Sequence, residues 1–247
     1  MTLRLPQKLL KSPLRETIFE MRFEPALAAA GDILPGLLYS ELKSDFPEVV
    51  PLPLASVPRA IREKTPDLVY QYAHSLRGSS GSVQLGDRVL AFHVIDYPGW
   101  IIFRAKIESL IKAVQATGLV KQLERFSFKY VNVIEASTSE KQLQLLNLKM
   151  ELVGHSPAEH GFQLRVEHEE GNCTIITCVS PNATAKLAFS GKEVAGLLVD
   201  VDTIRFDPGR EFWTAPGVLL DEAHAVAKVR FFSLLTESTL KRLEPVW

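Results

Sequence analysis

Four polar residues in the last fifth of the chain could together carry out metal-dependent chemistry. Asp200 and Asp202, in the segment VDVD, are two residues apart, so on a β-strand both would project from the same face. Paired carboxylates can bind Mg²⁺ or Mn²⁺, or share a proton. His224 could then act as a base and Lys228 could bind a phosphate, because a strand, a loop and a helix could bring them near the aspartates. The simpler interpretation is a solvent-facing side of an antiparallel sheet.

Four aromatic residues lie beside proline or glycine breaks and not in periodic segments: Tyr97, Trp100, Phe212 and Trp213. Large rings in loops often mark a surface that binds a ligand or a partner. They equally often cover the end of a sheet, and the sequence leaves both interpretations open. We therefore treat these four residues as candidates for a binding surface.

The short motifs of common catalytic sites are missing from the sequence. It contains neither the phosphate-binding patterns GxxxxGK[ST] and GxGxxG nor the hydrolase patterns GxSxG and HExxH. Cys173 and Cys178 fall within one predicted strand and would point to opposite faces, which does not suit a zinc site. His155, His160 and His168 lie around a predicted hairpin, where solvated histidines are commoner than ligands. We expect no metal and no other cofactor.

Composition and charge restrict the partners and the compartment. Of the 247 residues 46% are hydrophobic, and the formal net charge is -1, so we expect a folded core and no bulk electrostatic binding of nucleic acid. Two cysteines favour a reducing compartment. The N-terminal segment is too charged for a signal peptide, and no window is apolar enough to cross a membrane. We therefore expect a cytoplasmic protein that does not bind membranes.

Periodicity locates the elements that must position these residues. Residues 15–24 alternate as a half-buried strand, with Phe19, Met21 and Phe23 on one face and Glu20 and Arg22 on the other. Further strands are expected over 69–76, 82–95, 124–135, 145–153, 162–170, 173–180 and 195–206, and helices over 34–42, over 103–114 and from near residue 220 onward. Within 82–95, Gly86 and Asp87 form either a turn or a bulge in one long strand.

Details at three helix ends follow from the same pattern. Pro35 fits the first turn of its helix, and Gly118 fits the end of the second. Thr236 is a candidate N-cap for a short final helix that stops at Pro245.

The order of the elements indicates an α+β protein in which one or more antiparallel sheets pack with two or three long helices. The regular β–α alternation of a doubly wound fold is absent. We expect one compact unit of residues 1–247, with two similar sheet–helix halves, 1–136 and 137–247, as an alternative division.

Three stretches of the chain resemble a known family: PLRETIFEMRFEP (13–25), FKYVNVIE (128–135) and AHAVAKVRFFSLLTESTLKRLEP (223–245). They are similar to a sporadically distributed, uncharacterised prokaryotic protein family of about this length. The resemblance implies one conserved unit and an accessory or antitoxin-like role. It assigns no catalytic residue.

Two functions are compatible with these observations. The first is a non-catalytic protein that binds a protein partner or a small ligand, with a homodimer as a further option. The second is a metal-dependent phosphoryl or nucleotidyl enzyme that uses Asp200, Asp202, His224 and Lys228. The missing motifs, the loop aromatics and the near-neutral charge favour the first. The second requires the four residues to converge on one open pocket.

Overall fold

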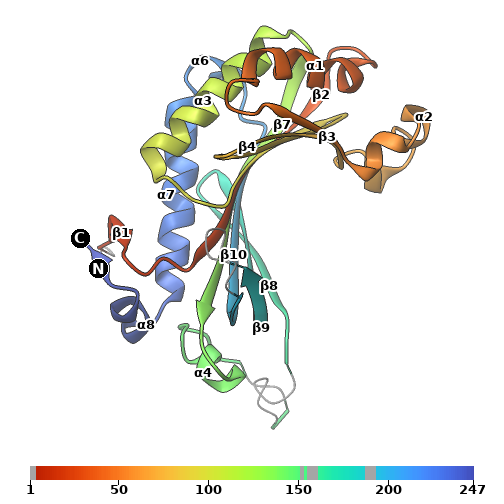
Figure 1. Ribbon diagram of the computed structural model, residues 1–247. Helices are drawn as coiled ribbons and strands as arrows, with labels where there is room; N and C mark the ends of the chain where they lie inside the picture. Colours follow the sequence, from red (N-terminus) through yellow and green to blue (C-terminus); the bar gives the residue numbers. More distant parts are fainter. Residues whose placement is uncertain (1–3, 151–152, 155–160, 187–192) are drawn as a thin grey trace. The chain divides into compact units, whose positions relative to one another are not determined.

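The alternating segment near the N-terminus forms strand β2 (Leu14–Pro25). The computed structural model describes residues 4–150, 153–154, 161–186 and 193–247 (Figure 1). In β2 the side chains of Phe19, Met21 and Phe23 are fully buried, and the residues between them are half-buried. This burial pattern confirms the strand and its two faces.

The largest element of the fold is an antiparallel sheet of nine strands. In spatial order its strands are β3 (Glu48–Pro51), β4 (Tyr72–Gly78), β5 (Gly81–Gly86), β6 (Val89–Val94), β2, β7 (Val120–Glu135), β10 (Glu193–Phe206), β9 (Cys173–Lys186) and β8 (Leu164–Glu170). A second, two-stranded sheet pairs β1 (Lys8–Leu9) with β11 (Pro245–Val246).

Three long helices accompany the sheet: α1 (Ala30–Leu42), α3 (Trp100–Ala116) and α7 (Pro216–Leu234). The shorter helical segments are η1 (Pro53–Ser56), α2 (Arg59–Arg62), η2 (Pro66–Leu68), α4 (Ser139–Leu143), α6 (Glu211–Thr214) and α8 (Glu237–Arg242). The predicted α+β class, an antiparallel sheet packed with long helices, is confirmed. No helix of the described residues is long and apolar enough to cross a membrane.

The chain divides into two compact units, each built from separate segments. Unit 1 comprises residues 1–17, 128–204 and 222–247, and unit 2 comprises residues 18–127 and 205–221. This division does not follow the expected boundary at residue 136, because long elements (β2, β7, β10 and α7) each contribute residues to both units.

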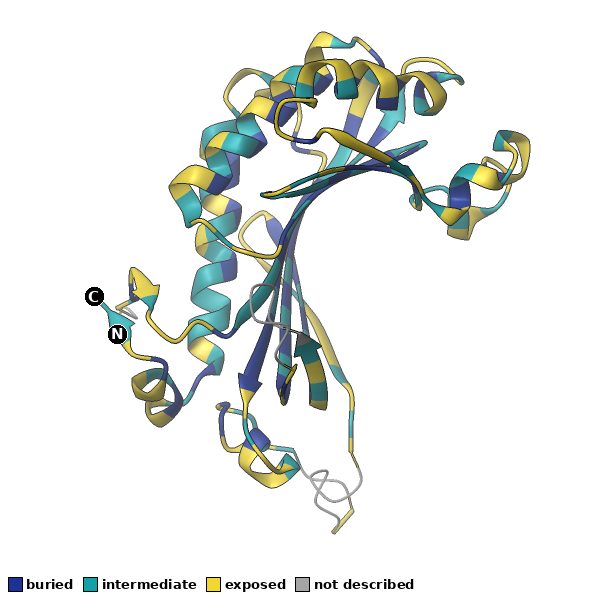
Figure 2. Cartoon of the chain, in the orientation of Figure 1, coloured by how far each residue is buried: buried dark blue, intermediate teal, exposed yellow. Residues whose placement is uncertain are grey.

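Unit 2 places α1 and α3 on one face of its strands. Helix α3 buries the apolar stripe that was predicted from its spacing, including Phe103 and Ile107. Phe92 of β6 stacks on Phe103 with 5.6 Å between the ring centroids, and Phe46 meets Phe92 edge-on. Figure 2 shows that the outward sides of both helices are exposed. The opposite face of these strands, which carries Glu20 and Arg22, is the open face of unit 2.

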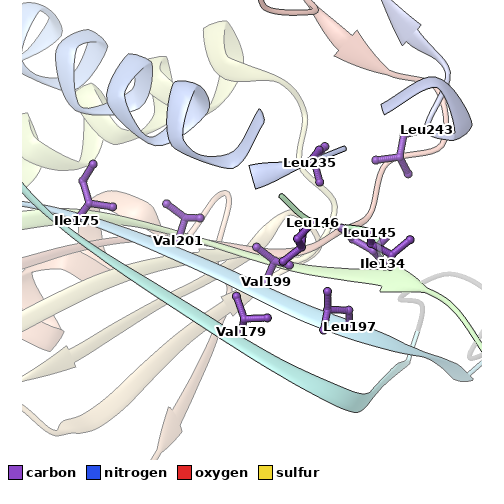
Figure 3. Packing of buried hydrophobic residues seen from close by; sticks show 10 residues of the cluster. All are labelled: Ile134, Leu145, Leu146, Ile175, Val179, Leu197, Val199, Val201, Leu235 and Leu243. Carbon is purple, nitrogen blue, oxygen red and sulfur yellow. The ribbon is translucent and has the colours of Figure 1, made fainter. Parts of the chain in front are cut away.

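Unit 1 packs the C-terminal part of α7 against one face of β7, β10 and β9. The buried cluster is shown in Figure 3 and consists of Ile134, Leu145, Leu146, Ile175, Val179, Leu197, Val199, Val201, Leu235 and Leu243. Val226 and Phe231 of α7 pack against it. The Thr236 hydroxyl accepts a hydrogen bond from the Thr239 backbone N–H, so the predicted N-cap of α8 is confirmed.

Several predicted boundaries were wrong. Helix α7 begins at Pro216 and not near residue 220, and α1 begins at Ala30, which puts Pro35 in its second turn. Residues 145–150 form no strand; Leu146 makes a single bridge to Leu235, and residues 151–152 of this prediction lie outside the described residues. Leu145, Leu146 and Leu148 give this segment the apolar pattern of a strand, but they belong to a loop that packs against the core.

Candidate functional site

The two predicted strand carboxylates lie on the side of β10 that α7 does not cover. Val199 and Val201 point into the cluster beneath the helix (Figure 3), so the alternation of the strand turns Asp200 and Asp202 to the other face. There the Lys129 Nζ is 3.3 Å from the Asp200 Oδ2. The expectation that both aspartates share a face therefore agrees with the structure, but the Asp200 carboxylate is paired with a lysine ammonium.

The electrostatics of this ion pair follow from its partial burial. Burial raises the pKa of Asp200, and Lys129 offsets only part of that rise. Burial alone lowers the pKa of Lys129, but Asp200 and Asp202 together raise it above its ordinary value. Burial, followed by the charge of Asp200, also raises the pKa of Cys178, so this thiol is held in its protonated, poorly nucleophilic form.

The two helical candidates lie on the other side of the same strands. The His224 Nδ1 on α7 is 2.8 Å from the Tyr130 hydroxyl on β7. Tyr130 follows Lys129 directly, and consecutive strand residues point to opposite faces, so the sheet separates His224 from Asp200. Lys228 lies one helical turn beyond His224, and burial lowers its pKa. The four residues of the enzyme hypothesis thus form two separate groups and no common pocket.

Metal binding has no other support among the described residues, where no group of three or more histidine, cysteine, aspartate and glutamate side chains could hold an ion. His155 and His160 lie outside the described residues. His168 is on β8, with its Nε2 3.8 Å from the Glu170 carboxylate.

Two of the loop aromatics are part of helix α3 and its approach. Trp100 is the first residue of α3, and its indole N–H donates a hydrogen bond of 2.7 Å to the Asp221 carboxylate. Arg104, one turn later, also binds Asp221. Tyr97 meets the Phe103 ring edge-on at 5.5 Å between centroids. These rings hold the start of α3 in place.

Of the other two aromatics, Phe212 corrects the predicted binding surface, whereas Trp213 is half-buried. Phe212 is fully buried and packs on Phe126 of β7 with 5.2 Å between ring centroids. Trp213 meets Phe212 edge-on. Phe212 is therefore a core residue and cannot be part of an exposed surface. The short helix α6 directs the Phe212 ring into the core. The proline and glycine residues around Phe212 indicate a loop and gave no sign of this helix.

The most elaborate polar arrangement lies on the open face of unit 2, and it was missed at the level of sequence. We call it the arginine–tyrosine cluster. Its members are Glu20, Arg22, Tyr70, Tyr72, Arg88, Glu124 and Arg125, which come from β2, β4, β7, the turn before β6 and the loop before β4.

Glu20 is the centre of the inner part of this cluster. Its carboxylate accepts hydrogen bonds from Arg125 at 2.6 Å, from Arg22 at 2.9 Å and from the Tyr72 hydroxyl at 2.6 Å. The side chains of Glu20 and Arg125 are only 15% and 12% exposed. Tyr72 reaches Glu20 although β5 and β6 lie between their strands, so the sheet curls over its open face. A register shift in β4 directly after Tyr72 accompanies this curl.

Glu124 is the centre of the outer part. It accepts a hydrogen bond of 2.7 Å from the Tyr70 hydroxyl and another from Arg88. The guanidinium carbons of Arg22 and Arg88 lie 4.5 Å and 5.8 Å from the centroid of the Tyr70 ring, within the range of a cation–π interaction. Arg88 also donates to the backbone carbonyl of Phe23. The side chains of Arg22 and Arg88 remain about one-third exposed, at 32% and 35%.

The chemistry of the cluster is hydrogen-bond donation. Burial, reinforced by the neighbouring glutamates, raises the pKa of Tyr70 and of Tyr72, so both phenols remain protonated donors. Guanidinium groups do not deprotonate in proteins. The arrangement can therefore hold an acceptor in a defined position, and it offers no arginine or tyrosine that could act as a base near neutral pH.

Part of this cluster could have been anticipated. The alternation of residues 15–24 already placed Glu20 and Arg22 together on the polar face of β2. Tyr70, Arg88 and Glu124 come from segments far apart in the chain, and no spacing rule connects them. Only the curled sheet brings them to Glu20 and Arg22.

Unit 2 also has an apolar pocket of about 380 Å³ between α1, α3 and the sheet. Its floor includes buried Phe46, Val83 and Phe92, and Asp45 and Lys106 are among its polar lining residues. The volume falls at the low end of pockets that hold small molecules.

Comparison of the sequence with protein-family models and with curated proteins returned no match. The assignment of a function therefore depends on the residues and their geometry.

Proposed function

We propose that this protein is a non-catalytic binding protein whose partner, another protein, binds the open face of unit 2. The observation that supports the proposal is the arginine–tyrosine cluster, a set of partly exposed donors held by a network of ion pairs. Arginine and tyrosine are enriched among the residues that dominate binding energy at protein interfaces.

The organisation of the cluster favours binding over structural stabilisation alone. Ion pairs of partly exposed side chains such as Arg22 and Arg88 contribute only modestly to stability, so these two arginines remain suited to contact with a partner. Their side chains are already restrained by Glu20, Glu124 and the Tyr70 ring, and a partner would therefore pay little conformational entropy to engage them. An accessory or antitoxin-like role, as implied by the family resemblance, is one form of such a function.

The enzyme alternative loses its geometric basis and is not proposed. Its carboxylates and its histidine point to opposite faces of the sheet. A small-ligand version of the binding function is favoured by the pocket between α1 and α3, and it can be tested separately by a substitution such as Ala105→Trp at its lining.

The test is affinity capture with the tagged protein and with the double variant Arg22→Gln/Arg88→Gln. The wild-type protein should retain a protein that the double variant loses, and the purified protein should then bind directly to the wild-type chain. Each lost charge-assisted hydrogen bond should weaken binding by about tenfold or more. The matched control is Arg210→Gln, which removes an exposed arginine of the same unit whose side chain makes no ion pair within the described residues.

The outcomes separate the alternatives. Equal capture by the wild-type protein and the double variant would place the binding surface elsewhere. Loss of capture in the Arg210 control as well would indicate a general effect of charge. Thermal unfolding of each variant shows whether it remains folded.

A further inference from the structure

We infer that the arginine–tyrosine cluster recognises a carboxylate, the side chain of an aspartate or glutamate in its protein partner. The inference rests on the proposed function and specifies its chemistry. Arg22 uses only its Nε within the network, and Arg88 uses its Nε and Nη2. Both Nη groups of Arg22 and the Nη1 of Arg88 thus have no protein acceptor among the described residues. A planar carboxylate matches such paired guanidinium donors.

The charge balance of the cluster fits a single monoanion. The cluster has three arginines and two glutamates, and the neighbouring Glu24, which the charge of Arg88 also influences, is paired with Lys121. One net positive charge therefore remains on this partly buried surface. A bound carboxylate would neutralise that charge. A phosphoryl group carries nearly twice the charge and would meet the carboxylates of Glu20 and Glu124, so the cluster suits it less. A nucleic acid needs several unpaired cations, and the chain as a whole has a net charge of -1.

The guanidinium groups of Arg22 and Arg88 are also held in position before any ligand binds. Arg88 contacts three groups: the Phe23 carbonyl, the Glu124 carboxylate and the Tyr70 ring, whose centroid is 5.8 Å from the guanidinium carbon. Arg22 is fixed by Glu20 and lies over the same ring. Two guanidinium groups beside one aromatic ring provide a binding position with little flexibility, which favours specificity for a planar acceptor.

The experiment is a selection from a random-peptide library displayed on phage, performed on the wild-type protein with the Arg22→Gln/Arg88→Gln variant as the counter-selection. Enriched peptides should share an aspartate or glutamate. Replacing that residue with asparagine or glutamine should weaken binding by about tenfold, measured by fluorescence anisotropy. Binding to the Arg210→Gln control should be unchanged. A phosphoserine version of the best peptide tests the phosphoryl alternative.

A second measurement avoids any variant that could unfold. On adding the selected peptide to the wild-type protein, the Nε–H resonances of Arg22 and Arg88 in the NMR spectrum should shift, while that of Arg210 should not. Three results would overturn the inference: enrichment without acidic residues, no enrichment over the double variant, or tighter binding of the phosphoserine peptide. If protein capture still depends on Arg22 and Arg88 in those cases, the proposed function stands and only carboxylate recognition fails.

Discussion

At the scale of single residues, the face of a strand determines which partner a side chain meets. Asp200 and His224 have the residue types of an active site, but one points away from α7 and the other is on it. Lys129 pairs with Asp200, and Tyr130, the next residue, pairs with His224. Each polar group thus has a local partner, and this explains why such residues occur here without catalytic convergence.

The ion pair of Lys129 and Asp200 leads to a test of stability. Lys129→Met should lower the free energy of unfolding by about 2 kcal/mol at neutral pH, because it leaves a mostly buried carboxylate without its cation. Urea unfolding measures the effect. The control Lys121→Met removes an exposed lysine of the same strand and should cost less than about 0.5 kcal/mol.

The same variant should have a characteristic pH dependence. Burial raises the folded-state pKa of Asp200, and the loss of Lys129 raises it further. A carboxyl group with a raised folded-state pKa binds its proton more tightly in the folded protein, so its destabilising effect is absent at low pH and develops as the pH rises above about 4. The Lys129→Met defect should therefore shrink in acid, and Asp200→Asn/Lys129→Met should abolish this dependence. A defect that is constant from acid to neutral pH would contradict the explanation.

At the scale of elements, contacts between helices determine where some of the predicted surface residues lie. Trp100 was expected in a loop and is instead the first residue of α3, bound to Asp221 of α7. Phe212 was a candidate for a binding surface; it is in α6 and is buried against Phe126 of β7. In both cases the proline and glycine residues near these rings mark the ends of helices and not an exposed loop.

The contact between Asp221 and α3 can be tested by Asp221→Ala. The variant loses the acceptor of the Trp100 indole and the ion-pair partner of Arg104, so it should be less stable by about 1 to 2 kcal/mol. Its tryptophan fluorescence should change in the folded state. Glu41→Ala, at an exposed position of α1 without an ion pair in the described residues, is the control and should unfold as the wild-type protein does.

At the scale of the whole molecule, the chain is not a series of independent halves. Each of the two units is assembled from segments that are distant in sequence. Unit 2 requires residues 205–221 in addition to residues 18–127, since Phe212 fills its core beside Phe126 and the Asp207 backbone N–H donates to the Glu124 carbonyl.

This arrangement predicts the behaviour of fragments. Residues 18–127 produced alone should not unfold cooperatively, because the cavity left by an absent phenylalanine side chain costs about 3 to 5 kcal/mol. Joining residues 205–221 to them through a flexible linker should restore cooperative unfolding and dispersed NMR resonances. A fragment of residues 18–127 with full cooperativity and native dispersion would show that the second segment is dispensable.

Taken by itself, the sequence determined the α+β class, most strands, the apolar stripe of α3, the N-cap Thr236 and the polar face of β2 with Glu20 and Arg22. These features follow from periodicity and capping, which act over a few residues. Only the tertiary structure decided that Asp200 and His224 are apart and that Arg22, Tyr70 and Arg88 are together. Whether these residues meet depends on strand order, on the curl of the sheet and on which face each helix covers. Strand order and curl are set by contacts between residues far apart in the chain, and the spacing of neighbouring residues carries no information about such contacts.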